Sequence, residues 1–212
     1  MQVIAICNSK GGVGKSTLAA ALAVRASNEL RVGLVDIDPQ QSLAEWFAQR
    51  PIKNAPEVYT GELDPQAVVQ KLLHTGLELV IIDGPPAYLD MVEEAIRTAD
   101  LVIIPVKPSI PDLRSTRDAI QLAITAAKPY LVVINDATKR DGTVDTTLAL
   151  LKRDRIPVAT TIIHHRVSHM HAMGAGKSAA EINGGRDKDA VEEIDNLWAE
   201  VANKLAALRV PA

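Results

Sequence analysis

The residues best suited to chemistry lie in one glycine-rich stretch near the start of the chain. It reads Asn8-Ser9-Lys10-Gly11-Gly12-Val13-Gly14-Lys15-Ser16-Thr17 and follows an apolar run; we call it the phosphate turn. Glycines between a strand and a helix let backbone N–H groups converge on phosphate oxygens, and the helix dipole adds to the attraction. We expect Lys15 to neutralise the β- and γ-phosphates and the Ser16 hydroxyl to bind Mg²⁺. The turn predicts a nucleotide site formed by Gly11, Gly12, Val13, Gly14, Lys15, Ser16 and Thr17.

Carboxylates follow two further apolar runs. Asp36 is the last residue of Val32 to Asp36, and Asp38 follows two residues later. Asp83 is the last residue of Leu79 to Asp83. A carboxylate at a strand end can hold Mg²⁺ or orient water, and phosphoryl transfer needs little else besides positioning and charge neutralisation. Each acid also has an ordinary alternative as a cap or a solvated turn residue. Following a phosphate turn, Asp83 fits the acid that holds Mg²⁺ directly or through water.

Short β-branched runs alternate with longer Ala- and Leu-rich stretches, and prolines fall at the junctions. Strands are expected at residues 3–7, 32–36, 79–83, 101–106, 130–135 and 158–163, and helices at 17–28, 42–49, 65–74, 89–98, 111–127, 143–153 and 189–208. This alternation is typical of a mainly parallel, twisted sheet with helices on both faces. We therefore predict an α/β fold in which residues 1–212 form a single domain.

The turn departs from the usual pattern G-x-x-x-x-G-K-[ST], because Ser9 stands where that pattern has its first glycine. The sequence Lys-Gly-Gly-Val-Gly-Lys-Ser resembles the deviant Walker A motif, KGGxGK[ST], of the ParA/MinD family of dimerising P-loop ATPases. The resemblance implies that Lys10 reaches across a sandwich dimer to the partner's ATP and is catalytic together with Lys15. Taken alone, Lys10 could equally be a solvated loop lysine.

Other segments extend the resemblance from Val3 to about Ile163. Val35-Asp36-Ile37-Asp38-Pro39-Gln40 is similar to the family's switch I segment, which implies that Asp38 positions the attacking water and Asp36 lies near Mg²⁺. Asn135 stands where family members contact adenine, although a strand-end turn residue is the alternative. The chain is most similar to small plasmid-type ParA proteins without an N-terminal helix-turn-helix domain, since the first strand begins at residue two or three.

Charge is segregated late in the chain. Residues 152–188 contain seven basic and three acidic side chains, within a chain of net charge −3. In the family, the ATP-bound dimer binds DNA without sequence preference through basic residues of the C-terminal part, and neutralising phosphates needs only a surface patch. The candidate DNA contacts are Arg166 first, then Lys152, Arg153, Arg155, Lys177, Arg186 and Lys188. A solvated helix face is the alternative for each.

Four of the five histidines, His164, His165, His169 and His171, lie close together. If the segment is helical, His165 and His169 share a face that could bind a metal, but no cysteine or paired acid completes a site. We favour a DNA-facing or hydrogen-bonding role, and protonation below about pH 6.5 would then strengthen DNA binding.

Together these features predict an ATP-dependent dimerising switch that binds DNA non-specifically and hydrolyses ATP weakly unless a ParB-like adaptor and DNA stimulate it. Its expected role is partition of a plasmid or chromosome. One alternative is ParA-like positioning of another cargo, such as a chemosensory cluster or a microcompartment. A MinD-like membrane switch is a poorer fit, because the last helix is rich in acids. An ATP-dependent ligase of a small metabolite remains a further alternative.

Composition narrows the range of protein classes. The chain is 47% hydrophobic and 23% charged, which is ordinary for a globular protein. Its longest apolar stretches are far below the roughly 18 residues that span a bilayer, and the N-terminus lacks a secretory signal. The single cysteine, Cys7, excludes an internal disulfide and a paired-cysteine iron–sulfur site. We expect Cys7 to fill the core of a cytoplasmic, nucleoid-associated protein.

Overall fold

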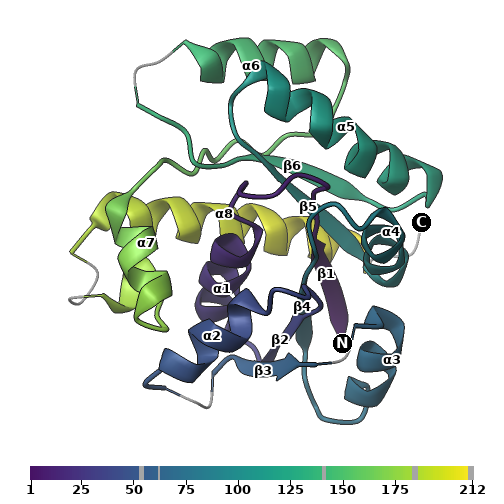
Figure 1. The fold of residues 1–212 in the computed structure, drawn as a ribbon, viewed down its shortest axis with the longest axis vertical. Coiled ribbons are helices and arrows are strands. Elements are labelled where there is room, and N and C mark those ends of the chain that lie inside the picture. The colour runs from purple at the N-terminus through teal and green to yellow at the C-terminus, as the bar shows by residue number, and fades with distance from the viewer. Residues whose placement is uncertain (53–54, 62, 140–141, 183–185, 210–212) are drawn as a thin grey trace.

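The protein is an α/β domain around a six-stranded sheet (Figure 1). The computed structural model describes residues 1–52, 55–61, 63–139, 142–182 and 186–209. The strand order is β3-β2-β4-β1-β5-β6, and every pairing is parallel. The strands are β1 (Gln2–Ile6), β2 (Val32–Asp36), β3 (Glu57–Thr60), β4 (Leu79–Asp83), β5 (Leu101–Val106) and β6 (Tyr130–Ile134). The predicted fold class is confirmed.

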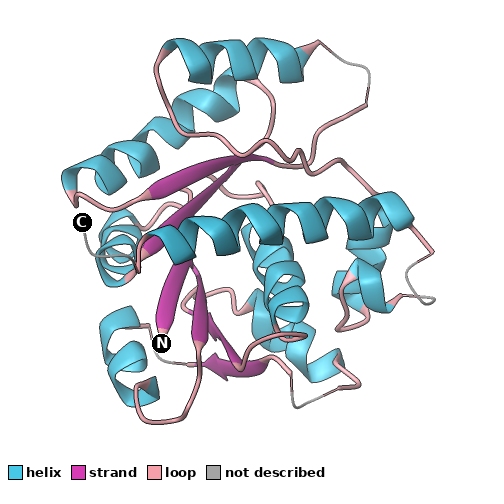
Figure 2. Ribbon diagram, turned by 180° about the vertical axis from the view of Figure 1, so that it is seen from behind, coloured by secondary structure: helices cyan, strands magenta, loops and turns pink. Residues whose placement is uncertain are grey.

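Helices cover both faces of the sheet (Figures 1 and 2). Crossovers between parallel strands are right-handed. Helices that connect a strand to one nearer β3 therefore lie on one face of the sheet, and helices that connect a strand to one nearer β6 lie on the other. The first face carries α1 (Lys15–Ala26), α2 (Ser42–Gln49), α7 (Val167–Gly174), the 3₁₀ turn η1 (Ala179–Glu181) and α8 (Lys188–Ala207). The second face carries α3 (Pro65–Leu72), α4 (Leu89–Thr98), α5 (Ile110–Thr125) and α6 (Thr143–Arg153). Each face has its own apolar core.

Local chemistry explains where several elements begin. Asp64 caps α3, accepting the N–H groups of Gln66 and Ala67, and Pro65 occupies the first turn as predicted. On α8 the apolar residues Ile194, Leu197, Val201 and Leu205 are buried on one face, with Leu197 and Val201 fully covered. An apolar stripe packed in this way fixes α8 to the first face of the sheet.

The carboxyl ends of the central strands meet at one edge. Ile6, the last residue of β1, is level with Asp83 of β4, and Asp83 is level with Asp36 of β2. The connections from β1 and β5 leave toward opposite faces, and a crevice for ligands forms where the strand order reverses in this way. The register therefore brings the phosphate turn and both acids to the same place.

Two elements differ from the sequence prediction. Residues 158–163 do not form a regular strand; their pairing with β6 and the residues after it is limited to isolated bridges, Val132 to Val158 and Ala137 to His164, and a hydrogen bond from the Ile163 N–H to the Ile134 carbonyl oxygen. Between these bridges, the N–H groups of Thr160 and Thr161 donate to the Glu200 carboxylate of α8 instead. A side chain thus satisfies the donors that a sheet ladder would have used, and this part of the prediction was wrong. The edge strand β3 was not predicted, because its four residues include two polar ones.

Candidate functional site: a phosphate turn at the switch point

The phosphate turn has the backbone shape that phosphate binding requires. Gly12 and Gly14 have φ angles of 73° and 84°, a region that side chains other than glycine rarely adopt. A Cβ atom on Gly14 would also lie 2.4 Å from the side-chain nitrogen Nδ2 of Asn135. Helix α1 begins at Lys15, so its first N–H groups face the turn. These features fit a polyphosphate cradle.

Lys15 is positioned inside this cradle. Its side chain is mostly buried, and Nζ donates to the Lys10 carbonyl oxygen at 3.2 Å. Burial lowers the pKa of Lys15, while the nearby carboxylates of Asp83 and Asp38 oppose that shift. An ammonium with one neutral partner and two nearby acids can exchange its carbonyl partner for phosphate oxygens at little cost in desolvation.

Asp83 has unused capacity for a cation. Both of its carboxylate oxygens are buried and form no hydrogen bond of ordinary geometry among the described residues, although the Ser16 hydroxyl lies close enough to affect its pKa. Burial raises the pKa of Asp83 to about 8; the Ser16 hydroxyl and Lys15 lower it, and Asp36 and Asp38 raise it further. A buried carboxylate beside a hydroxyl is an oxygen donor set of the kind that Mg²⁺ takes. Ser16 and Asp83 therefore fit the predicted metal, which would draw charge from the phosphates when bound.

We expect Asp83→Asn to stabilise the nucleotide-free protein, because it removes a buried acid that lacks partners. A carboxyl whose pKa is raised on folding weakens the fold above its ordinary pKa, so the gain should be present at pH 7.5 and vanish toward pH 4. Thermal unfolding in EDTA should show a rise of about 4 to 8 °C, equivalent to roughly 2 kcal/mol. Glu94→Gln on α4 is the matched control; a fall in melting temperature for Asp83→Asn would contradict this account.

Asp36 and Asp38 organise the loop that follows β2. Asp36 accepts the N–H groups of Asp38 at 3.0 Å, Leu43 at 2.9 Å and Ala44 at 3.3 Å, so it fastens the start of α2. Asp38 is mostly buried, and its Oδ1 accepts the Gln40 N–H at 2.9 Å. The other Asp38 oxygen has no hydrogen bond among the described residues, whereas both Asp36 oxygens accept backbone donors. The predicted place of Asp36 near Mg²⁺ stays a prediction.

The Lys10 side chain lies at the rim of the phosphate turn, whereas the Lys15 side chain lies inside it. The Lys10 side chain is 38% exposed and forms an ion pair with Asp112 in the first turn of α5. Burial alone would raise the pKa of Asp112, but hydrogen bonds from Lys10 and Ser109 hold it below its ordinary value. The solvated-loop alternative for Lys10 is therefore incomplete, since the side chain has a fixed acidic partner. Whether Lys10 reaches a partner subunit stays a prediction.

A cavity of about 340 Å³ continues from the turn toward α7 and α8. Gly12, Gly14 and Thr17 line one side. Its other walls include Lys107, Asn135, Asp136, His164, His165, His169 and Met170. The size is within the usual range for a small-ligand site. A nucleoside attached to phosphates on the turn would extend into this cavity.

Asn135 has a contact that the sequence did not predict. Its Nδ2 donates to the Val13 carbonyl oxygen at 2.7 Å, so the side chain braces the phosphate turn from β6. It still lines the cavity. The predicted adenine contact therefore stays a prediction, for which the amide oxygen and the second Nδ2 hydrogen are not used by the bond to Val13.

The histidines have separate environments. His164 Nδ1 lies 2.8 Å from a Glu193 oxygen, and His165 Nδ1 lies 2.6 Å from Asp136, which also pairs with Lys107. His165 precedes α7 and so shares no helix face with His169. Burial lowers the pKa of His169. No group of three or more metal-binding side chains was found within the described ranges, which leaves the metal alternative without support.

Arg166 is held by acids that the sequence window left out. Its guanidinium pairs with Glu193, Asp187 and Asp189, and only 11% of its side chain is exposed. Glu193 and Asp189 belong to α8, beyond the end of the basic window at residue 188. A DNA phosphate would have to displace these carboxylates. The predicted DNA contact of Arg166 stays a prediction that would require this exchange of partners.

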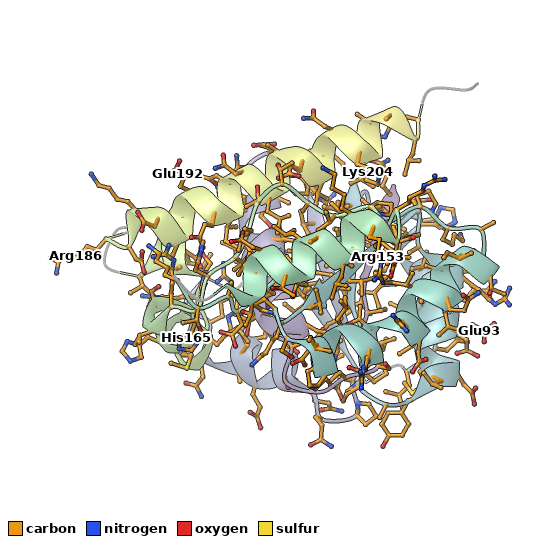
Figure 3. All side chains as sticks on the ribbon, turned by 90° about the horizontal axis from the view of Figure 1, so that it is seen from above. Glu93, Arg153, His165, Arg186, Glu192 and Lys204 are labelled. Atoms are coloured by element: carbon orange, nitrogen blue, oxygen red, sulfur yellow. The ribbon has the colours of Figure 1, made fainter. Side chains whose placement is uncertain are left out.

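The remaining basic candidates are spread over two regions. Lys152, Arg153 and Arg155 lie exposed at the end of α6, where Arg153 pairs with Asp154. Lys177 follows α7, and Arg186 and Lys188 lie at the start of α8. Figure 3 shows Arg186 and Arg153 well apart. They do not form one patch on a single chain, and their contact with DNA stays a prediction.

Cys7 takes no part in chemistry. It is fully buried beside Gly84, and burial raises the pKa of its thiol to about 12. A thiol with such a pKa carries negligible thiolate at neutral pH, and the thiolate is the reactive form. The predicted core role fits this environment.

Comparisons with known proteins agree with this geometry. A family model described as the CobQ/CobB/MinD/ParA nucleotide binding domain matches residues 4–179. Maintenance of carboxysome distribution protein A from Halothiobacillus neapolitanus is 31% identical over 208 residues, covering 93% of this chain and 95% of that protein.

Two solved structures are similar in fold. A plasmid partition protein from Borrelia burgdorferi bound to AMPPNP has a TM-score of 0.76 at 20% identity, covering 96% of this chain and 99% of its own. McdA from Cyanothece in complex with ATP has a TM-score of 0.74 at 18% identity, covering 95% of this chain and 96% of its own. The chain therefore belongs to the CobQ/CobB/MinD/ParA family of nucleotide-binding domains, and its resemblance to the ParA and MinD ATPases is confirmed.

Proposed function

We propose that this protein is an ATP-driven, dimerising switch that positions a protein-bounded cargo, such as a microcompartment, along non-specific DNA. The observation that carries the switch is the arrangement of the two lysines. Lys15 lies inside the phosphate cradle beside the unpartnered Asp83, whereas Lys10 has a partly exposed side chain that pairs with Asp112 outside the cradle. This difference supports assigning Lys15 to its own nucleotide and Lys10 to a nucleotide that approaches from outside.

The residues divide the hydrolytic work between them. Lys15 and the turn amides neutralise and orient the phosphates, and Ser16 and Asp83 would hold Mg²⁺, which would supply further positive charge there. Asp38 orients water toward the γ-phosphate. Lys10 of a second subunit adds positive charge while the bond between the γ-phosphorus and the bridging oxygen of ADP breaks. Positioning and charge stabilisation of this kind account for most of the rate gain in phosphoryl transfer.

The cargo is proposed from sequence likeness along the whole chain. The relative from Halothiobacillus neapolitanus, whose name refers to carboxysome distribution, matches nearly end to end. Plasmid partition, the main expectation from the sequence, becomes the second candidate, supported by the fold of the Borrelia burgdorferi protein. Non-specific DNA, reached through the basic residues of two subunits together, serves either function as the surface along which the dimer moves. An adaptor on the cargo stimulates hydrolysis.

A membrane surface is a poorer partner. The apolar face of α8 is packed against α1 and the sheet, with Ile194, Trp198 and Leu205 buried. A helix whose apolar face is already covered cannot insert that face into lipid. Among the described residues, moreover, there is no helix of the length and apolarity that a membrane crossing needs.

We expect Asp38→Ala to trap the ATP-bound dimer. Its carboxylate is placed to orient water and does not hold the phosphates, so nucleotide binding should persist while turnover falls by about 10² to 10³-fold. Phosphate release and gel filtration with Mg-ATP measure the two effects. Asp64→Ala, at a distant helix cap, is the control. A monomeric Asp38→Ala protein with normal turnover would remove Asp38 from the mechanism.

The cargo is tested in the source organism by replacing the gene with a Lys15→Ala allele. Electron tomography then shows the distribution of protein-bounded bodies, and plating shows plasmid retention. Clustered bodies with normal plasmid retention support the proposal. Plasmid loss with evenly spaced bodies would favour partition.

A further inference from the structure

Asn8 joins the phosphate turn to two other parts of the fold. It is fully buried, and its Nδ2 donates to the Pro105 carbonyl oxygen at 2.7 Å and to Thr116 Oγ1 at 3.0 Å. Its Oδ1 accepts the backbone N–H of Lys10 at 3.0 Å, which closes a local turn. Both amide hydrogens and the carbonyl oxygen therefore have partners, so the orientation of the amide is fixed.

Thr116 sets that orientation from α5. The threonine is fully buried, and its hydroxyl donates to the Asp112 carbonyl oxygen at 2.9 Å. With its hydrogen used there, the hydroxyl offers Asn8 only a lone pair, so it discriminates between the two ends of the Asn8 amide. The Thr116 and Asn8 side chains together link the backbone of α5 to the backbone of Lys10.

Two more contacts attach the same part of the turn to α5. Ser9 Oγ donates to the Ser115 carbonyl oxygen at 2.9 Å, and the Lys10 ammonium pairs with Asp112. The three consecutive residues before Gly11 are thus all fastened to the first two turns of one helix. Lys15, by contrast, is the first residue of α1. Lys10 is thus held against α5 from the loop, whereas Lys15 is part of α1.

We propose that Asn8, oriented by Thr116, is a positioning residue for Lys10 that sets the Lys10 backbone from α5. Among the described residues, Lys15 touches that backbone through one bond, to the Lys10 carbonyl oxygen, which it would exchange for phosphate oxygens when ATP binds. The proposal deepens the proposed function, on which it rests for the role of Lys10 toward a second subunit. Neither Asn8 nor Thr116 lines the nucleotide cavity, so both act through Lys10.

Thr116→Val and Thr116→Ser form a matched pair for the test. Valine has nearly the shape of threonine but no hydroxyl, so one Asn8 hydrogen is left buried without an acceptor, which is costly. Serine keeps the hydroxyl and loses a methyl group. An effect of Thr116→Val that Thr116→Ser does not share is due to the hydrogen bond.

The first measurement needs neither ATP nor a dimer. Amide hydrogen exchange by NMR in nucleotide-free protein should show the Lys10 N–H exchanging about tenfold faster in Thr116→Val than in wild type. Thr116→Ser should match wild type. The Leu18 N–H, bonded to the Gly14 carbonyl oxygen in α1, should stay unchanged in every variant. Unchanged exchange at Lys10 in Thr116→Val would overturn the proposal.

The second measurement uses Mg-ATP. In Thr116→Val the dissociation constant of the ATP-dependent dimer should rise about tenfold, while ATP affinity of the monomer stays within about twofold. Equal weakening of both, or an equal effect of Thr116→Ser, means general damage to the fold and overturns the proposal. If wild type fails to dimerise with ATP, the proposed function fails, and the exchange experiment still decides the role of Asn8. Should Thr116→Val not fold, Thr116→Ala carries the same two measurements.

Discussion

Replacing Lys15 with alanine should weaken ATP binding by about 10² to 10³-fold. Its ammonium would make charge-assisted hydrogen bonds to phosphate oxygens, each worth about 1.5 to 3 kcal/mol, and every 1.4 kcal/mol is about tenfold. The fold should survive, because Lys15 Nζ has a single hydrogen bond, to the Lys10 carbonyl oxygen. Titration of a fluorescent ATP analogue with Mg²⁺ measures the loss.

The control for Lys15→Ala is the exposed Lys139→Ala, which removes a surface ion pair with Asp189. Such pairs contribute little, so Lys139→Ala should bind ATP as wild type does. Circular dichroism establishes that both variants are folded. A folded Lys15→Ala protein with near-normal ATP affinity would mean that the turn does not hold the phosphates in the manner described.

The second large effect concerns Lys10→Ala, for which ATP binding and dimerisation should separate. The Lys10 backbone keeps its bonds to Asn8 and Lys15, so the cradle should stay intact and ATP affinity should change by less than about threefold. The ammonium that would reach the partner's ATP is lost. We expect no ATP-dependent dimer, and hydrolysis lower by on the order of 10³-fold, as for other cationic groups supplied in trans.

Sedimentation with Mg-ATP and steady-state phosphate release test Lys10→Ala, with Lys139→Ala again as control. Lys10→Arg is informative, since a guanidinium keeps the charge but has a different shape and hydration. Normal dimerisation and hydrolysis by Lys10→Ala would withdraw the central support for the switch. Loss of ATP binding as well would show that Lys10 serves its own nucleotide.

The sequence predicted well wherever the signal was local. The glycines of the phosphate turn, the apolar strand ending in Asp83 and the capped start of α3 at Asp64 and Pro65 each encode their structure in a few neighbouring residues. The sheet then follows from the alternation of such elements. Most of the candidate nucleotide site was therefore predictable, including the meeting of the turn with Asp83.

The features that the sequence did not predict depend on residues far apart in the chain. Glu200 of α8 takes the N–H groups that would have made residues 158–163 a strand, and Glu193 neutralises Arg166. Asp112, which pairs with Lys10, lies 102 positions after it in the chain. The one available hint for Asn8 was a polar residue between an apolar run and a glycine turn, which is also ordinary for loops. Pairings of this kind become visible only when the chain is folded.

The inert environment of Cys7 has a practical consequence for these experiments. The chain has no other cysteine, and this one is fully buried with a thiol pKa of about 12. A cysteine introduced at an exposed position, such as Ile124, would then be the sole thiol that reacts with maleimide in the folded protein. Fluorophores can be attached at one chosen point without first removing the native cysteine, so the proposed dimerisation and DNA binding can be tested on otherwise unmodified molecules.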